Sequence, residues 1–169
     1  MPRRLAAAVA LLLLASCALV PSAFAATARV TVRSTKDGSV LVDGHGKSLY
    51  MFGPDSKTKS ACSGACAQNW PPLVTSGKPK AGSGVSAKKL KTIKRSNGKM
   101  QVTYAGHPLY GFIADAAAGD VNGQGLNAFG GLWSLLTPSG SKVTGTGSSA
   151  PPSMPAPTPS PTPTPTYPY

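Results

Sequence analysis

Apolar and polar residues alternate with a period of two in the first half of the chain, a pattern typical of β-strands that bury one face. The alternation runs through residues 29–33, and a second strand is expected at residues 39–42. Between these two segments lie Asp37 and Gly38, a pair that favours a tight hairpin turn. The pattern therefore predicts an antiparallel hairpin near the start of the chain.

The same pattern returns in the second half. Residues 91–94 and 100–104 alternate in the same way, and Asn97 and Gly98 between them form the strongest short hairpin signal. No segment shows a convincing apolar stripe at helical spacing. Single helical turns are expected only at residues 61–68 and 115–118.

A sequence motif is also repeated, because Leu-Tyr-x-Phe-x-x-Asp occurs twice. Each copy follows a Gly-His pair and precedes a Trp-x-x-Leu segment. Such self-similarity indicates one supersecondary unit that cannot bury its apolar face alone. We therefore predict an all-β fold, a small duplicated domain of two hairpin-based halves with pseudo-two-fold symmetry. The motif residues are Leu49, Tyr50, Phe52 and Asp55 in the first copy and Leu109, Tyr110, Phe112 and Asp115 in the second.

The repeated side chains have a structural and a functional interpretation. The aromatic residues of the motif, with Trp70 and Trp133, form either the core or a ligand platform, and we favour the core. Asp55 and Asp115 stand where a strand ends, so each is interpreted as a cap of a helical turn rather than as one of a catalytic carboxylate pair.

Composition sets the boundaries of the folded part. Repeat one covers about residues 29–75 and repeat two about 88–137, within a domain spanning 26–141, and a soft linker at 76–86 joins them. Residues 142–169 are rich in Pro, Thr and Ser and cannot bury enough apolar area to offset chain entropy. We predict that they form a disordered tail.

Residues 1–25 have the pattern of a signal peptide. A basic start precedes an apolar run, and Ala23-Phe24-Ala25 provides a small-x-small cleavage site. The protein is therefore predicted to be secreted or at the cell surface, with no transmembrane span in the mature chain. The alternative is a lipoprotein, because residues 14–17 resemble a lipobox that would place a lipid on Cys17 and tether the protein to the outer face of the membrane.

The two cysteines that remain after export are Cys62 and Cys66. An even number of thiols in an oxidising compartment predicts a disulfide. Closing so short a loop adds only about 2 kcal/mol to the free energy of unfolding through chain entropy. The bond is therefore expected to fix one turn of chain rather than to hold the domain together.

The combined motifs resemble a known bacterial family. They comprise the repeated motif, Cys-x-x-x-Cys-Ala-x-x-Trp-Pro-Pro-Leu at residues 62–73, and Gly130-Gly131-x-Trp133. This set is similar to the secreted repeat of unknown function, also described as predicted lipoproteins with a Yx(FWY)xxD motif. The resemblance implies an exported, duplicated small domain, often lipid-anchored, and supplies no activity. This chain differs from many relatives in having a Pro-Thr tail at its C-terminus.

The charge is strongly basic, with 17 Lys and Arg against 5 acidic residues, and a net charge of +12. Such an excess attracts polyanions, which outside a cell are envelope polymers and lipid head groups. The alternative is a solubilising Lys-rich face. Few aromatic residues are interleaved, so no nucleic acid is expected as a partner. The cationic stretch contains Lys78, Lys80, Lys88, Lys89, Lys91, Lys94, Arg95 and Lys99.

Metal sites are the remaining candidates for cofactor chemistry. His45, His107, Cys62 and Cys66 carry donor atoms that suit copper or zinc. Two turn histidines and a plain disulfide explain the same residues, so no cofactor is predicted.

A second metal candidate is a Gly-rich loop with oxygen ligands at alternate positions. Asp120, Asn122 and Gln124 resemble the opening of a calcium loop, but the distal Glu is missing from a chain without Glu. Side chains that bond their own backbone are the alternative.

No catalytic motif stands out, since no Ser lies in Gly-x-Ser-x-Gly and the one Cys pair is expected to be oxidised. We therefore predict an exported, non-enzymatic binding or structural protein of the cell envelope. The competing hypothesis is an extracytoplasmic copper- or redox-handling protein that uses Cys62, Cys66 and a histidine.

Overall fold

A computed structural model of the chain describes residues 26–144. The predicted signal peptide, including Cys17, lies outside the described residues, as does the predicted tail from residue 145 onward. Within residues 26–144, no helix is long and apolar enough to cross a membrane.

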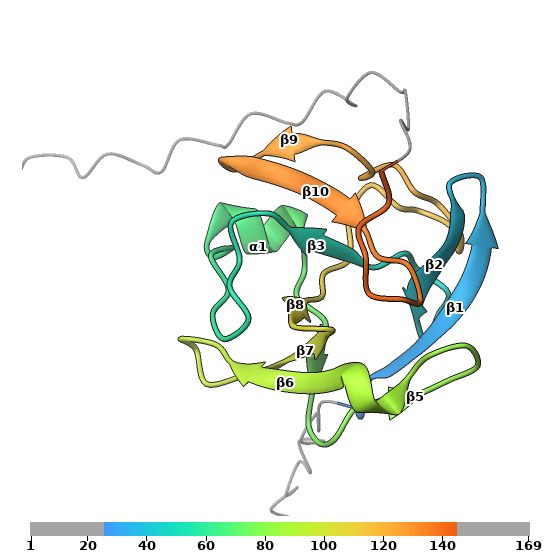
Figure 1. The fold of residues 1–169 in the computed structure, drawn as a ribbon. Coiled ribbons are helices and arrows are strands. Elements are labelled where there is room, and N and C mark those ends of the chain that lie inside the picture. Colours follow the sequence, from blue (N-terminus) through green and yellow to red (C-terminus); the bar gives the residue numbers. More distant parts are fainter. Residues whose placement is uncertain (1–25, 145–169) are drawn as a thin grey trace, which may run out of the picture.

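The described chain is built mostly of short strands, as the alternating pattern predicts (Figure 1). One short α-helix and one 3-10 turn, Ala87–Lys89, accompany them. The elements are β1 (Arg29–Thr35), β2 (Gly38–Asp43), β3 (Tyr50–Phe52), α1 (Ala65–Asn69), β4 (Val74–Thr75), β5 (Lys80–Ala81), β6 (Leu90–Lys94), β7 (Met100–Tyr104), β8 (His107–Pro108), β9 (Asn127–Ala128) and β10 (Gly131–Leu135).

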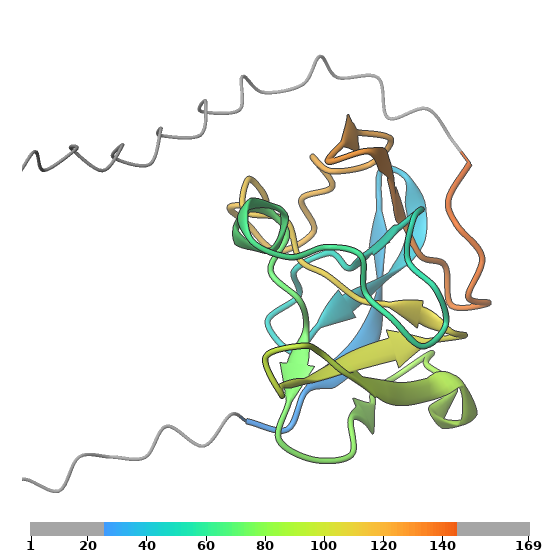
Figure 2. The ribbon, with the colours of Figure 1, turned by 90° about the vertical axis from the view of Figure 1, so that its left-hand side faces the viewer.

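The two predicted hairpins are confirmed. β1 pairs antiparallel with β2, and β6 pairs antiparallel with β7. Their turns contain Gly38 and Gly98 at φ 97° and 79°, a left-handed conformation that glycine adopts without steric cost. A third hairpin, β9–β10, lies at the opposite end of the domain from β6–β7 (Figure 1, Figure 2).

The halves exchange strands rather than standing side by side. β10 of the second repeat pairs with β3 of the first, and β4 of the first repeat pairs with β7 of the second. Equivalent hydrogen bonds join the segments: Leu41 N donates to Leu136 O at 2.9 Å, and Val102 N donates to Leu73 O at 2.8 Å. Each half therefore completes the sheet of the other.

A pseudo-two-fold axis passes between Tyr50 and Tyr110. Tyr50 N donates to Tyr110 O at 2.8 Å, and Tyr110 N donates to Tyr50 O at 3.0 Å. The indole rings of Trp70 and Trp133 stack with centroids 3.9 Å apart and planes 3° apart. These reciprocal contacts confirm two halves related by pseudo-two-fold symmetry.

The core is divided into an aromatic and an aliphatic cluster. In the aromatic cluster, Phe112 stacks on Trp70 at 4.1 Å, and Phe52 stacks on Trp133 at 4.3 Å, so four rings form one column through the Trp pair. All four side chains are buried. The aromatic residues of the motif are therefore core residues, as predicted.

The linker and the end of the domain are more structured than their composition suggests. Residues 80–81 of the linker form β5, which pairs parallel with β1. Beyond the predicted boundary at residue 141, Val143 N donates to Leu135 O at 2.8 Å, and its side chain packs on the aromatic cluster. Pairing with distant strands supplies the order that these segments lack locally.

Candidate anion-binding site

The repeated Tyr and Asp residues bond across the two halves. Tyr50 Oη donates to Asp115 Oδ2 at 2.7 Å, and Tyr110 Oη donates to Asp55 Oδ2 at 2.7 Å. Each motif therefore supplies a donor to the other half and accepts one from it. We call these two crossed Tyr–Asp hydrogen bonds the clasp, and the Tyr-to-Asp spacing of the motif places its donors and acceptors.

The second oxygen of each carboxylate holds a loop. Asp55 Oδ1 accepts the backbone N–H of Ala61 at 2.7 Å, and Asp115 Oδ1 accepts that of Asn122 at 2.9 Å. The prediction that these acids cap helical turns is wrong. Helix α1 begins only at Ala65 with Gly64 at its N-cap, and residues 115–118 contain no helix. The loops instead reach back to the carboxylates.

Burial dominates the electrostatics of the clasp. It raises the pKa of both carboxyls, Asp55 and Asp115, above the ordinary value, an effect that the hydrogen bonds they accept partly offset. Burial also raises the pKa of Tyr50 and Tyr110, and the neighbouring carboxylates add to that rise. Both phenols therefore stay protonated and act as hydrogen-bond donors.

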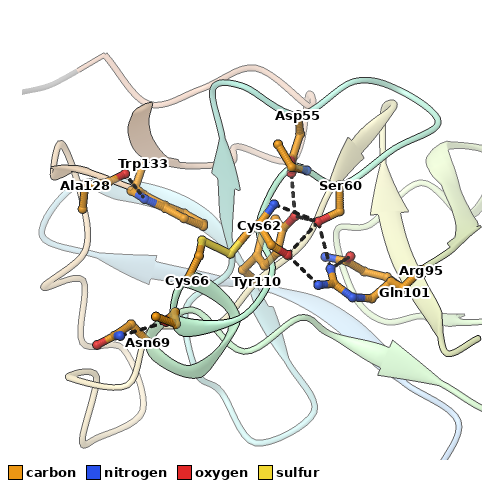
Figure 3. The surroundings of a disulfide bond; sticks show 12 residues. Asp55, Ser60, Cys62, Cys66, Asn69, Arg95, Gln101, Tyr110, Ala128 and Trp133 are labelled. Atoms are coloured by element: carbon orange, nitrogen blue, oxygen red, sulfur yellow. Dashed lines mark hydrogen bonds between the residues drawn. A yellow bond between two sulfur atoms is a disulfide. The ribbon is translucent and has the colours of Figure 1, made fainter. Parts of the chain in front are cut away.

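The surroundings of the two clasps differ. Around Tyr50, the hydroxyl oxygen accepts the buried backbone N–H of Gly123 at 3.2 Å. Around Tyr110, the hydroxyl lies 2.7 Å from Ser60 Oγ, and a polar network leads outward from there (Figure 3). The pseudo-symmetric frame therefore carries an asymmetric polar site.

Arg95 is the centre of this network. Its Nη1 donates to Ser60 Oγ at 2.9 Å and to Gln101 Oε1 at 2.5 Å, and its Nη2 donates to Cys62 O at 2.6 Å. Arg95 is also fixed by its backbone at the β6–β7 turn, where its N–H bonds Lys99 O at 2.9 Å. The guanidinium is thus held against the loop that carries the disulfide (Figure 3).

A hollow of about 880 Å³ opens beside Arg95, between the 54–63 loop and the β6–β7 turn. Its described lining contains three cationic side chains, several hydroxyls and no acid. It is lined by Pro54, Ser56, Thr58, Lys59, Ser60, Ala61, Cys62, Ser63, Lys94, Arg95 and Ser96.

A second hollow, of about 530 Å³, adjoins the first, because both are lined by Thr58. Its described lining adds four lysines, which come from β6, from the 3-10 turn before it and from the 54–63 loop, and again contains no acid. We call the two hollows together the basic groove. The second is lined by Lys57, Thr58, Lys88, Lys89, Lys91, Thr92, Ile93, Thr103, Ala105 and Gly106.

The predicted disulfide forms between Cys62 and Cys66, whose Cα atoms lie 5.3 Å apart. Both cysteines are buried in the aromatic cluster. The bond closes the turn that presents Cys62 O to Arg95, so it braces one wall of the groove.

Reducing the disulfide is expected to lower the free energy of unfolding by about 2 kcal/mol, because a short loop is released in the unfolded chain while both buried sulfur atoms are kept. Urea unfolding of the wild type with and without a thiol reductant measures the difference. A loss several times larger would show that the bond holds the whole domain together.

The structure does not gather the predicted metal ligands. Within residues 26–144, no group of three or more His, Cys, Asp or Glu side chains is placed to hold a metal ion. His45 is exposed in the turn after β2, and its N–H bonds Asp43 Oδ1. His107 is half-buried in β8, and burial lowers its pKa.

The calcium candidate uses its polar groups internally. Asp120 Oδ2 accepts the N–H of Ala117, and Asn122 Nδ2 donates to Ala114 O. Gln124 Nε2 donates to Val143 O, and its Oε1 accepts the N–H of Leu135. These contacts follow the alternative in which the loop bonds backbone groups.

Sequence comparison identifies the family. A family model described as a secreted repeat of unknown function matches residues 31–74 and 91–137, together more than half of the chain. The chain belongs to this family, so the predicted resemblance and the duplication are confirmed, and the family description supports an extracellular location. No curated protein and no solved structure matches the chain.

The sequence did not identify Arg95, Ser60 and Gln101 as one cluster. A signal was present in the difference between the repeats. Leu41 and Val102 occupy equivalent positions in the two halves, so the residues before them, Val40 and Gln101, are also equivalent. Both are buried, but Val40 is apolar and Gln101 is polar. A polar residue at the core position of only one repeat marks where the halves diverge in chemistry.

Proposed function

We propose that this exported protein is a non-enzymatic binding protein of the cell envelope, and that its basic groove holds an anionic polymer rich in phosphate and hydroxyl groups. The observation that carries the proposal is the gathering of cations in two adjoining hollows. Both hollows are lined by Thr58, and their cationic side chains come from β6, from the 3-10 turn before it and from the 54–63 loop. Cations spread over two adjoining hollows suit an extended polyanion better than a single small ion.

The lining favours a polyol or sugar phosphate over a nucleic acid. Ser and Thr hydroxyls contribute to both hollows and offer hydrogen bonds to a hydroxylated chain. No aromatic side chain occurs among the described residues of the lining, so the groove lacks the stacking surface that single-stranded nucleic acids need.

The lysines of β6 also have a structural explanation, since β6 lies at the edge of its sheet and charged residues protect exposed edges. That explanation does not account for Lys57 and Lys59, which face β6 from the 54–63 loop. Cations that converge from two segments favour a ligand between them.

We expect the protein to be retained on isolated cell walls at low ionic strength and released as salt shortens the range of electrostatic attraction. Replacing Lys91 and Lys94 with glutamine is expected to reduce the retained fraction severalfold. The measurement is the amount of protein bound to sedimented walls across a salt series.

The matched control replaces Lys36 and Lys142 with glutamine, because this pair removes the same charge without lining the groove. It should bind like the wild type. Walls stripped chemically of their phosphate polymers should retain little protein. Equal losses in both double variants would indicate attraction by net charge alone and would count against a groove.

A further inference from the structure

We infer that Arg95 forms the centre of a subsite that binds one phosphate group at the end of the groove formed by the larger hollow. This inference rests on the proposed function and specifies where a phosphate of the polymer is held. The subsite comprises the guanidinium of Arg95, the ammonium groups of Lys59 and Lys94, and the hydroxyls of Ser60 and Ser96.

The charge of Arg95 has no counter-ion in the described structure. Its three hydrogen bonds go to a hydroxyl, an amide oxygen and a backbone carbonyl, all neutral groups. Among residues 26–144, the ion pair found is Lys36 with Asp37, so no carboxylate lies within 4.0 Å of the guanidinium nitrogens. A half-buried guanidinium without a carboxylate is stabilised when an anion binds beside it.

Asp55 does not act as the counter-ion of Arg95. It is near enough for the charge of Arg95 to lower its pKa, although burial raises that pKa more strongly. Its two oxygens accept hydrogen bonds from Tyr110 and from the backbone of Ala61. Asp55 therefore belongs to the clasp between the halves and forms no ion pair with Arg95.

Donors are available for that ligand. A guanidinium carries five N–H groups. The two on Nη1 and one on Nη2 bond Ser60, Gln101 and Cys62, which leaves the Nε–H and the second Nη2–H without a partner among the described residues. Planar N–H donors bind phosphate oxygens through short charge-assisted hydrogen bonds. Exposed Lys59 and Lys94 beside them add positive charge from two different segments.

The duplication does not supply a second such subsite. The residue equivalent to Gln101 is Val40, which is buried in the aromatic cluster and offers no acceptor to orient an arginine. Within residues 26–144, the structure therefore assigns this phosphate subsite to one half of the domain and not to the other.

The test uses inorganic phosphate as the probe and NMR of the ¹⁵N-labelled protein as the readout. We expect saturable shifts at the Arg95 Nε–H and at the backbone N–H groups of residues 60–63, fitting one site. Acetate at matched ionic strength should cause much smaller shifts. Equal shifts with phosphate and acetate would show that the shifts come from general screening of charge by salt, and would overturn the inference.

Arg95→Lys keeps the charge but loses the planar fork, so we expect phosphate to bind at least roughly tenfold more weakly. Because Arg95 also braces the 60–62 segment, Lys94→Gln provides a second test at an exposed position and should weaken phosphate binding severalfold. Lys142→Gln is the control and should bind phosphate like the wild type. Unchanged affinity in both groove variants would overturn the inference.

The outcomes separate the subsite from the polymer. Retention on walls that depends on Lys91 and Lys94, without saturable phosphate binding, would overturn the subsite and leave the proposed function in place. Phosphate binding that depends on Arg95, without retention on walls, would support the subsite and contradict the proposed polymer ligand.

Discussion

Replacing Trp70 with alanine is expected to lower the free energy of unfolding by about 3–5 kcal/mol, the usual cost of deleting a large buried aromatic side chain. Trp70 is completely buried between Phe112 and Trp133, and its ring also forms a T-shaped contact with Tyr50. Its removal leaves a cavity on the pseudo-two-fold axis, where both halves lose packing at once. Urea unfolding followed by circular dichroism measures the change.

Two further variants sharpen this prediction. Leu132→Ala is the control, because this side chain is 43% exposed and its truncation should cost less than about 1 kcal/mol. Trp70→Phe should cost less than Trp70→Ala, because phenylalanine preserves stacking and removes an indole N–H that has no hydrogen-bond partner in the described structure. A Trp70→Ala variant as stable as Leu132→Ala would show that the aromatic column does not hold the halves together.

Removing the hydroxyl of Tyr50 is the second large effect that we expect, with a loss of free energy of unfolding of roughly 2–6 kcal/mol. Tyr50→Phe leaves two groups unpaired, Asp115 Oδ2 and the N–H of Gly123, and each unsatisfied buried group costs about 1–3 kcal/mol. Tyr110→Phe should cost less, since Ser60 and Asp55 beside it are half-buried and can bond water instead. Chemical unfolding of both variants measures the difference.

A double-mutant cycle separates the clasp from general packing. Combining Tyr50→Phe with Asp115→Asn should cost clearly less than the sum of the single losses, because the two groups share one hydrogen bond. Pairing Tyr50→Phe with Asp55→Asn should be closer to additive, since Asp55 bonds Tyr110 instead. Additive losses in the first pair would contradict an energetic link between the halves at Tyr50 and Asp115.

The clasp and the groove suggest how duplication serves binding in this protein. Both halves contribute equally to the frame through reciprocal backbone pairs, stacked indoles and crossed Tyr–Asp bonds. Around Tyr110, Ser60 and Arg95 extend the polar network to the larger hollow, and the described residues around Tyr50 show no equivalent contact. A symmetric frame can thus keep its stability while one copy acquires a ligand site.

Much of the local structure follows from neighbouring residues. The period-two pattern and the turn residues Gly38 and Gly98 encode the two hairpins, since strand faces and tight turns depend on residues close together in the chain. The repeated motif reveals the duplication, and the two cysteines that remain after export to an oxidising compartment suffice to predict the Cys62–Cys66 bond.

The partners of these elements depend on tertiary packing. Three sets of contacts join residues that are far apart in the chain. Tyr50 bonds Asp115 of the opposite half, and β4 and β10 pair with strands of the opposite half. Arg95 bonds Ser60 and Cys62. Two similar halves satisfy the same local rules whether each closes on itself or exchanges strands. The exchange buries the aromatic column, and only the assembled fold brings the basic groove together.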